Sequence, residues 1–130
     1  MRNEYANRYL QDKVTTASPA ELIGMLYDAG VVAMQAGKAA IEGRNVADAH
    51  RHLVRAQDIV MELRCSLRPE AGEIARNLDE LYDFLYKLLV SANTKKDARS
   101  VAQSLRLFTP LRDAWAAAVL GRAPAAAAVA

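Results

Sequence analysis

The side chains that could do chemistry in this chain are few. Two histidines, His50 and His52, and one cysteine, Cys65, are the only residues of their kinds among 130. A di-metal carboxylate site in a helical bundle needs Glu-x-x-His pairs on two helices, and no glutamate lies three residues before either histidine. Cys65 has no second cysteine for a disulfide and no obvious histidine partner for thiol catalysis. These residues predict no metal site, no cofactor and no enzyme.

Phosphoryl transfer is a sharper chemical alternative, because histidine phosphotransfer domains carry one exposed histidine on a helical bundle. His50 points away from the apolar side of its helical stretch, and His52 flanks it. The residues after them lack the glycine and small-residue setting of such domains. No Gly-rich phosphate loop occurs either, since Gly24, Gly30 and Gly37 have the wrong spacing. Phosphotransfer stays open as an alternative.

The elements that would position any site are four helical stretches, separated by breaker and capping residues. Ser18-Pro19-Ala20-Glu21 joins an N-cap serine, a proline at the first helical position and a capping-box glutamate. A helix is therefore expected from Ser18 toward Gly43. The next stretches are expected over about 45–67, 70–93 and 94–119, the last opened by a T-x-x-D cap of Thr94 and Asp97.

Apolar residues in these stretches recur in steps of three and four, and strand-like alternation is absent. Short linkers between long helices imply antiparallel neighbours. The predicted fold is all-α, an antiparallel up-down four-helix bundle. Its predicted seams are Val46, Ala49, Leu53, Ala56, Val60, Leu63 and Leu67; Ile74, Leu78, Leu81, Leu85, Leu88 and Ala92; and Ala98, Val101, Leu105, Phe108 and Trp115.

Glycine and proline interrupt this pattern. Gly30 and Gly37 lie inside the first helical stretch, where each glycine costs roughly 0.5–1 kcal/mol relative to alanine. Either another chain segment approaches closely there, or the bundle tolerates them. Pro110 either kinks the last helix or begins a separate final helix capped by Thr109.

Length and charge bound the class of protein. A chain of 130 residues fits one domain, expected over residues 1–121, with a short N-terminal helix in residues 1–13 and a disordered Ala-rich tail at 122–130. The net charge is +2 without a basic cluster, so nucleic acid is not expected as a partner. No apolar run would span a membrane and no signal peptide opens the chain, so we expect a cytoplasmic protein without membrane insertion.

Apolar residues outside the seams suggest a surface for a protein partner. The second stretch carries Ala47, Val54, Met61 and Cys65 opposite its seam. The third stretch carries Tyr82, Phe84, Tyr86 and Leu89 in addition to the residues of its own seam. Surplus apolar surface on a soluble monomer often marks a binding groove, whereas single exposed apolar residues are ordinary.

Several motifs resemble those of the FliS family of flagellar secretion chaperones. Tyr9 and Val14 occupy its aromatic and valine positions before the first helix, and the Thr15–Asp28 run resembles its opening signature. The matches keep chain order over about residues 5–118. They are RAQDIV at 55–60 for RAQDII, GEIARNLDELYDFLY at 72–86 for GEIAxNLxxLYxY, LVSAN at 89–93 with Asp97 for LxxANxxxD, and LRDAW at 111–115.

The resemblance implies an antiparallel bundle that binds the disordered C-terminal segment of flagellin in the bacterial cytosol. It implies that this prevents premature polymerisation and that the complex reaches a component of the flagellar type III export gate. Tyr5, Tyr9 and Leu10 would cover the groove and dock to the gate. The groove residues that the resemblance suggests are Ile23, Leu26 and Tyr27 on the first helix and Tyr82, Leu85 and Leu89 on the third. Asn77 and Asn93 would form hydrogen bonds with the client backbone.

Other roles remain open for these residues. Asn77 and Asn93 could equally cap a helix or join two helices, and Trp115 is expected in the core. We expect a monomer or a weak dimer. A structural bundle that self-associates stays open beside phosphotransfer as a function other than the chaperone.

Overall fold

The computed structural model describes residue 11 and residues 16–119. The predicted tail at 122–130 lies outside the described residues, as does almost all of the predicted helix in residues 1–13. The described part is helical, and its elements are α2 (Pro19–Glu42), α3 (Val46–Cys65), the short 3-10 turn η1 (Pro69–Ala71), α4 (Glu73–Lys95) and α5 (Ala98–Val119).

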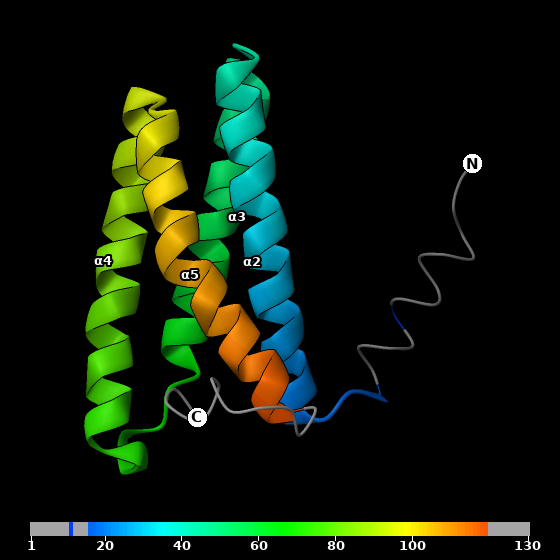
Figure 1. Ribbon diagram of the computed structural model, residues 1–130, viewed down its shortest axis with the longest axis vertical. Coiled ribbons are helices and arrows are strands. Elements are labelled where there is room, and N and C mark those ends of the chain that lie inside the picture. The colour runs from blue at the N-terminus through cyan, green and yellow to red at the C-terminus, as the bar shows by residue number, and fades with distance from the viewer. Residues whose placement is uncertain (1–10, 12–15, 120–130) are drawn as a thin grey trace.

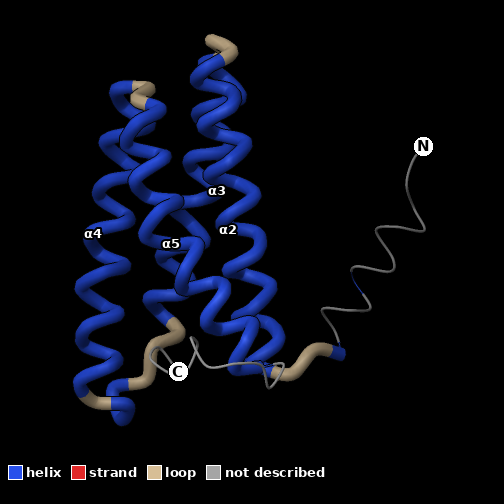
Figure 2. Tube along the Cα trace, in the orientation of Figure 1, coloured by secondary structure: helices blue, strands red, loops and turns tan. Residues whose placement is uncertain are grey.

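The four long helices pack as an antiparallel up-down bundle. α2 contacts α3 and α5, and α4 contacts the same two helices from the other side (Figure 1). Short loops join successive helices (Figure 2). The predicted all-α architecture is confirmed. No helix within residues 16–119 is both long and apolar enough to cross a membrane.

Side-chain caps fix where the helices begin. Ser18 and Glu21 form the predicted capping box: the Glu21 N–H donates to Ser18 Oγ at 3.1 Å, and the Ser18 N–H donates to Glu21 Oε1 at 2.9 Å. Asn45 caps α3 by accepting from the Asp48 N–H at 3.0 Å. Both starts agree with the sequence prediction.

The predicted cap at Thr94 is wrong. α4 continues to Lys95, and the Thr94 hydroxyl donates to the Val90 carbonyl at 2.9 Å. Lys96 takes a left-handed conformation with φ 52° and ends the helix there. Asp97 then caps α5 by accepting from the Arg99 N–H at 3.0 Å, so this helix begins three residues later than predicted.

Pro110 lies inside α5 without ending it. α5 is continuous from Ala98 to Val119, so Thr109 does not cap a separate final helix. The C-terminal half of α5 leans across the bundle toward the start of α2 (Figure 1). Pro110 lacks an N–H and is exposed, so the missing backbone bond lies at the surface.

The apolar seam of α4 agrees with the predicted one at Leu85 and Ala92, which are buried, and differs from it by one position at three other places. The predicted positions 74, 81 and 88 lie beside the core rather than in it: Ile74 is 46 % exposed, and Leu81 and Leu88 are half-buried. Apolar residues occupy both adjacent rows, so spacing alone could not choose between them. The buried residues of α4 are Ala75, Tyr82, Leu85, Leu89, Ala92 and Asn93.

A buried pair of tyrosine hydroxyls crosses the centre of the bundle. Tyr27 Oη on α2 lies 2.6 Å from Tyr82 Oη on α4, and both residues are almost fully buried. Burial raises the pKa of both phenols above the ordinary value of 10.0, because it disfavours the charged form. Each hydroxyl satisfies the other in a core with little room for water.

Close approach of α2 to its neighbours depends on two glycines. A Cβ at Gly30 would lie 2.7 Å from Phe108 Cε2 of α5 and 3.2 Å from Ile59 Cγ2 of α3. A Cβ at Gly37 would lie 2.7 Å from Leu53 Cδ2 of α3. Of the two explanations left open by the sequence, close helix approach is therefore the correct one.

We expect Gly30→Ala to lower the free energy of unfolding by about 1–3 kcal/mol, because the methyl group overlaps the Phe108 ring. Gly24→Ala is the matched control: its Cβ would meet Trp115 Cδ1 at an ordinary 3.5 Å. That change should be neutral or stabilise by up to about 1 kcal/mol through helix propensity. Urea denaturation measures both, and equal effects would contradict the close-packing account.

We expect Tyr82→Phe to destabilise the protein by about 1–3 kcal/mol, because it leaves the Tyr27 hydroxyl buried without a partner. Replacing both tyrosines with phenylalanine removes both polar groups and should cost less than the single change. A double-mutant cycle by thermal and urea unfolding measures the coupling. Additive effects of the two changes would show that the hydroxyls do not depend on one another.

Candidate functional site

Four of the predicted groove residues lie in the core. Tyr27, Tyr82, Leu85 and Leu89 are each at most 3 % exposed and pack among the four helices. A partner could touch these side chains only if the helices separated. Their role in partner binding stays a prediction.

The other predicted groove residues have different surroundings. Ile23 and Leu26 are half-buried on α2, and Asn77 is exposed on α4. Asn93 is buried and joins two helices: its Nδ2 lies 3.0 Å from His50 Nδ1 of α3, and its Oδ1 accepts from Lys96 Nζ at 2.9 Å. Tyr5, Tyr9 and Leu10 lie outside the described residues.

The outward side of α2 is a surface that the seam analysis missed. Apolar residues recur there in steps of three and four, which places them in one row along the helix. Leu22 is 37 % exposed and Val32 is 63 % exposed, while the others are half-buried. The row, called here the α2 stripe, consists of Leu22, Met25, Ala29, Val32 and Ala36.

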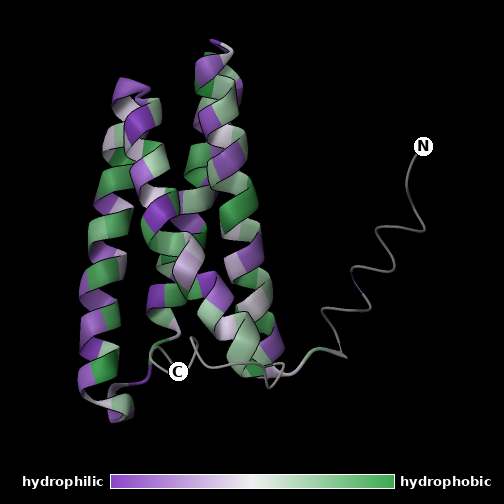
Figure 3. Ribbon diagram, viewed as in Figure 1, coloured by the Kyte–Doolittle hydropathy of each residue, from purple (hydrophilic) through white to green (hydrophobic). Residues whose placement is uncertain are grey.

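A helix that is apolar nearly all round is normally covered on every side. α2 has its polar residues confined to a narrow strip that includes Glu21, Asp28 and Gln35, and apolar residues elsewhere. Figure 3 shows hydrophobic residues along this helix at the edge of the bundle. The all-round apolarity was the signal in the sequence that could have identified the α2 stripe.

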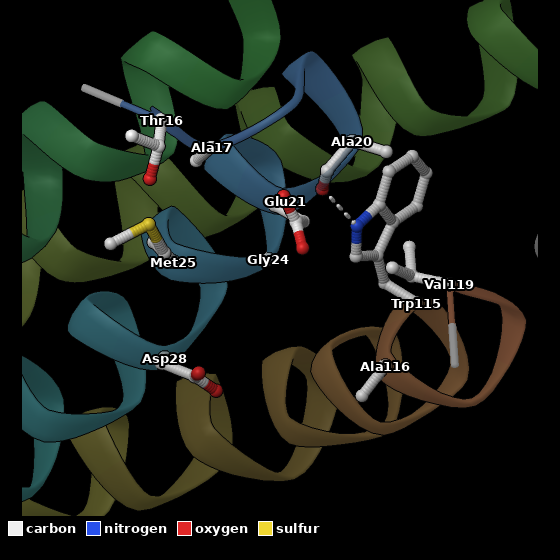
Figure 4. A pocket seen from close by; sticks show the side chains of 10 residues that line it. All are labelled: Thr16, Ala17, Ala20, Glu21, Gly24, Met25, Asp28, Trp115, Ala116 and Val119. Atoms are coloured by element: carbon white, nitrogen blue, oxygen red, sulfur yellow. Dashed lines mark hydrogen bonds between the residues drawn. The ribbon is translucent and has the colours of Figure 1, made fainter. Parts of the chain in front are cut away.

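A hollow of about 400 Å³ lies on one side of the α2 stripe, between the start of α2 and the end of α5 (Figure 4). Trp115 forms one wall, and its Nε1–H donates to the Ala20 carbonyl at 2.9 Å. Gly24 lines the opposite wall and has no side chain to fill the hollow. Met25 belongs both to the lining of the hollow and to the α2 stripe. Trp115 is half-buried against the core, so its predicted core position is confirmed in part.

A second hollow of about 420 Å³ lies on the other side of the stripe, between α2 and α3. Leu26, Val54 and Ile59 supply its apolar lining. Four charged residues of α3 also line it: Arg51, Arg55, Asp58 and Glu62. Glu21 and Asp28 line the first hollow, so the apolar stripe has charged residues on both sides. Such a surface suits an amphipathic segment rather than a small polar substrate.

The residues considered for chemistry are dispersed. His50 is exposed and its Nδ1 faces Asn93, while His52 is half-buried with Nε2 3.4 Å from Arg51. Cys65 is exposed at the end of α3. Among the described residues, no three His, Cys, Asp or Glu side chains lie close enough together to hold a metal ion.

Comparison with known proteins adds the biological context. The family model described as "Flagellar protein FliS" matches residues 1–122. The chain is 34 % identical to the flagellar secretion chaperone FliS of Bacillus subtilis, over 92 % of this chain and 88 % of the relative. It is also 34 % identical to the flagellar secretion chaperone FliS of Salmonella typhimurium, over 85 % of this chain and 84 % of the relative. The chain therefore belongs to the FliS family and is a flagellar secretion chaperone, not an enzyme.

Proposed function

We propose that this chaperone binds the C-terminal segment of flagellin in the bacterial cytoplasm. Binding prevents premature polymerisation, and the complex is delivered to the flagellar type III export apparatus. The observation that carries the proposal is the α2 stripe, a continuous row of exposed and half-buried apolar side chains between two hollows.

The stripe has the dimensions of a helix-binding surface. From Leu22 to Ala36 it spans fourteen residue steps of α2, or about 21 Å at 1.5 Å per residue. A client helix of about four turns would match that length, with apolar anchors at i, i+3, i+4 and i+7. The flanking hollows would receive the largest of these anchors.

The energetics suit a client that is disordered before it binds. Ordering such a segment costs about 2–5 kcal/mol of the contact energy. Fully burying one Val, Leu or Met side chain contributes about 1.5–3 kcal/mol. Because Leu22 and Val32 are already ordered on a rigid helix, the chaperone side loses little entropy, and a few client anchors can offset the ordering cost.

Covering apolar residues of the client would also explain how polymerisation is prevented. A segment that lies on the α2 stripe cannot at the same time contact a neighbouring flagellin. For Tyr5, Tyr9 and Leu10 we retain the proposal that they cover the groove before client binds and contact the export gate. The start of α2 borders the α2–α5 hollow, which the preceding chain could therefore reach.

We expect Val32→Asp to weaken binding of a flagellin C-terminal peptide at least tenfold, because it places a charge at the most exposed residue of the stripe. Gln35→Asp is the matched control: it puts the same side chain at an exposed site on the polar strip of α2 and should leave affinity within about twofold. Isothermal titration calorimetry measures both affinities, and circular dichroism measures the expected gain in peptide helicity.

The outcomes separate function from site. Failure of the folded wild-type protein to bind the cognate peptide would overturn the proposed function. Normal binding by Val32→Asp would retain flagellin binding but move the client away from the α2 stripe. Equal weakening by Gln35→Asp would indicate a general charge effect rather than an apolar contact.

A further inference from the structure

The charged residues beside the α2 stripe change sign along its length. On the α3 side they form one row of exposed side chains, spaced by one helical turn, that lines the hollow between α2 and α3. The row, called here the α3 rim, consists of Arg51, Arg55, Asp58 and Glu62. In chain order it presents two cations and then two anions.

Contacts between α2 and α3 determine which part of the stripe each charge accompanies. A Cβ at Gly37 would lie 2.7 Å from Leu53 Cδ2, and one at Gly30 would lie 3.2 Å from Ile59 Cγ2, so the two helices run in opposite directions along the stripe. The cations of the α3 rim therefore lie beside the C-terminal half of the stripe. The anions lie beside its middle and its N-terminal half.

Charges on the other side of the stripe have the same polarity. Glu21 and Asp28 line the hollow between α2 and α5, beside the N-terminal half of the stripe (Figure 4). Arg112 of α5 lies 3.8 Å from Asp28 but pairs more closely with Asp113, at 2.8 Å, so these three side chains together stay negative. Anions thus flank the N-terminal half on both sides.

Three charges of the α3 rim are available to a partner. Within the described residues, no ion pair joins Arg55, Asp58 or Glu62 to another side chain. Arg51 pairs with Asp48 at 3.2 Å, so Arg55 is the cation of the rim that keeps its full charge for a partner. An exposed guanidinium can bind a carboxylate through two N–H donors.

We infer that the client helix lies parallel to α2, with its N-terminal end between the anions and its C-terminal end at Arg55. The inference rests on the proposed function, in which the C-terminal segment of flagellin becomes helical on the α2 stripe. A helix has a partial positive charge at its N-terminus and a partial negative charge at its C-terminus. A C-terminal segment also ends in a free carboxylate, which adds a full negative charge at that end.

The apolar contacts do not set this direction by themselves. The residues of the stripe recur in steps of three and four, and a client row with the same steps can lie on them in either direction. Charges at the edge of an interface contribute to orientation and register more than to affinity. Arg55 is therefore assigned as a residue that determines the orientation of the client.

Titration with a peptide that ends at the natural C-terminus of flagellin tests this assignment. At low ionic strength, amidation of the peptide C-terminus should weaken binding to wild type about two- to fivefold, because it removes the carboxylate that faces Arg55. Arg55→Glu should bind the amide at least as well as the acid. Arg106→Glu, the same charge reversal at an exposed site on α5, should keep the wild-type ratio. Isothermal titration calorimetry measures all six affinities.

A nitroxide spin label at either end of the peptide tests the direction independently. The label at the C-terminal end should broaden the NMR signals of backbone amides around Arg55 most strongly. The label at the N-terminal end should broaden those around Gly24 most strongly, because that residue lies at the acidic end of the stripe.

The outcomes keep this inference apart from the proposed function. A reversed broadening pattern, no effect of amidation on wild type, or an equal effect on wild type and Arg55→Glu would overturn the inferred direction while flagellin binding stands. Failure of the folded wild-type protein to bind either form of the peptide would instead overturn the proposed function.

Discussion

The packing of α2 against α3 and α5 depends on the absence of side chains at Gly30 and Gly37. Phe108 and Leu53 occupy the space that methyl groups would need there. This close approach brings α2 near enough to the bundle axis for Tyr27 to reach Tyr82 on α4. The glycines weaken α2 as an isolated helix but permit the contacts that hold the four helices together. The outward side of α2 is then presented on a rigid support.

That support explains how one helix can serve both the core and a partner. α2 buries Tyr27, Val31 and Met34 on one side and exposes Leu22 and Val32 on the other. Two-sided apolarity would be a liability in a helix with no partner, because exposed apolar surface favours association. We propose that in this secretion chaperone the exposed side binds an apolar client segment, between the hollows beside α3 and α5.

Sequence reasoning predicted the fold because its signals were local or strictly periodic. The capping box at Ser18 and Glu21 placed the start of α2. The apolar steps of α3 matched its buried side from Ala49 to Leu63, but Val46 at the first turn is 63 % exposed. It misplaced the start of α5 because Thr94 and Asp97 both resemble caps, and only the left-handed Lys96 decides between them. It misplaced the α4 seam because Ile74, Leu81 and Leu88 repeat with the same period as Ala75, Tyr82 and Leu89. The hydroxyl partner of Tyr82 lies on a distant helix and cannot be read from spacing.

The same limit applied to the candidate site. Tyr27, Tyr82, Leu85 and Leu89 are apolar or aromatic, and that property alone does not distinguish a core position from a groove. The exposed fraction of a side chain depends on the neighbouring helices, so only the three-dimensional structure identifies Val32 as the most exposed residue of the α2 stripe.

The most direct test of the client surface is site-specific photocrosslinking with the reactive group placed at Val32 or at Phe84, in the presence of full-length flagellin. The account predicts a flagellin adduct from position 32, mapped by mass spectrometry to the C-terminal segment, and no flagellin adduct from the exposed position 84 on α4. Flagellin adducts from position 84 with none from position 32 would contradict it.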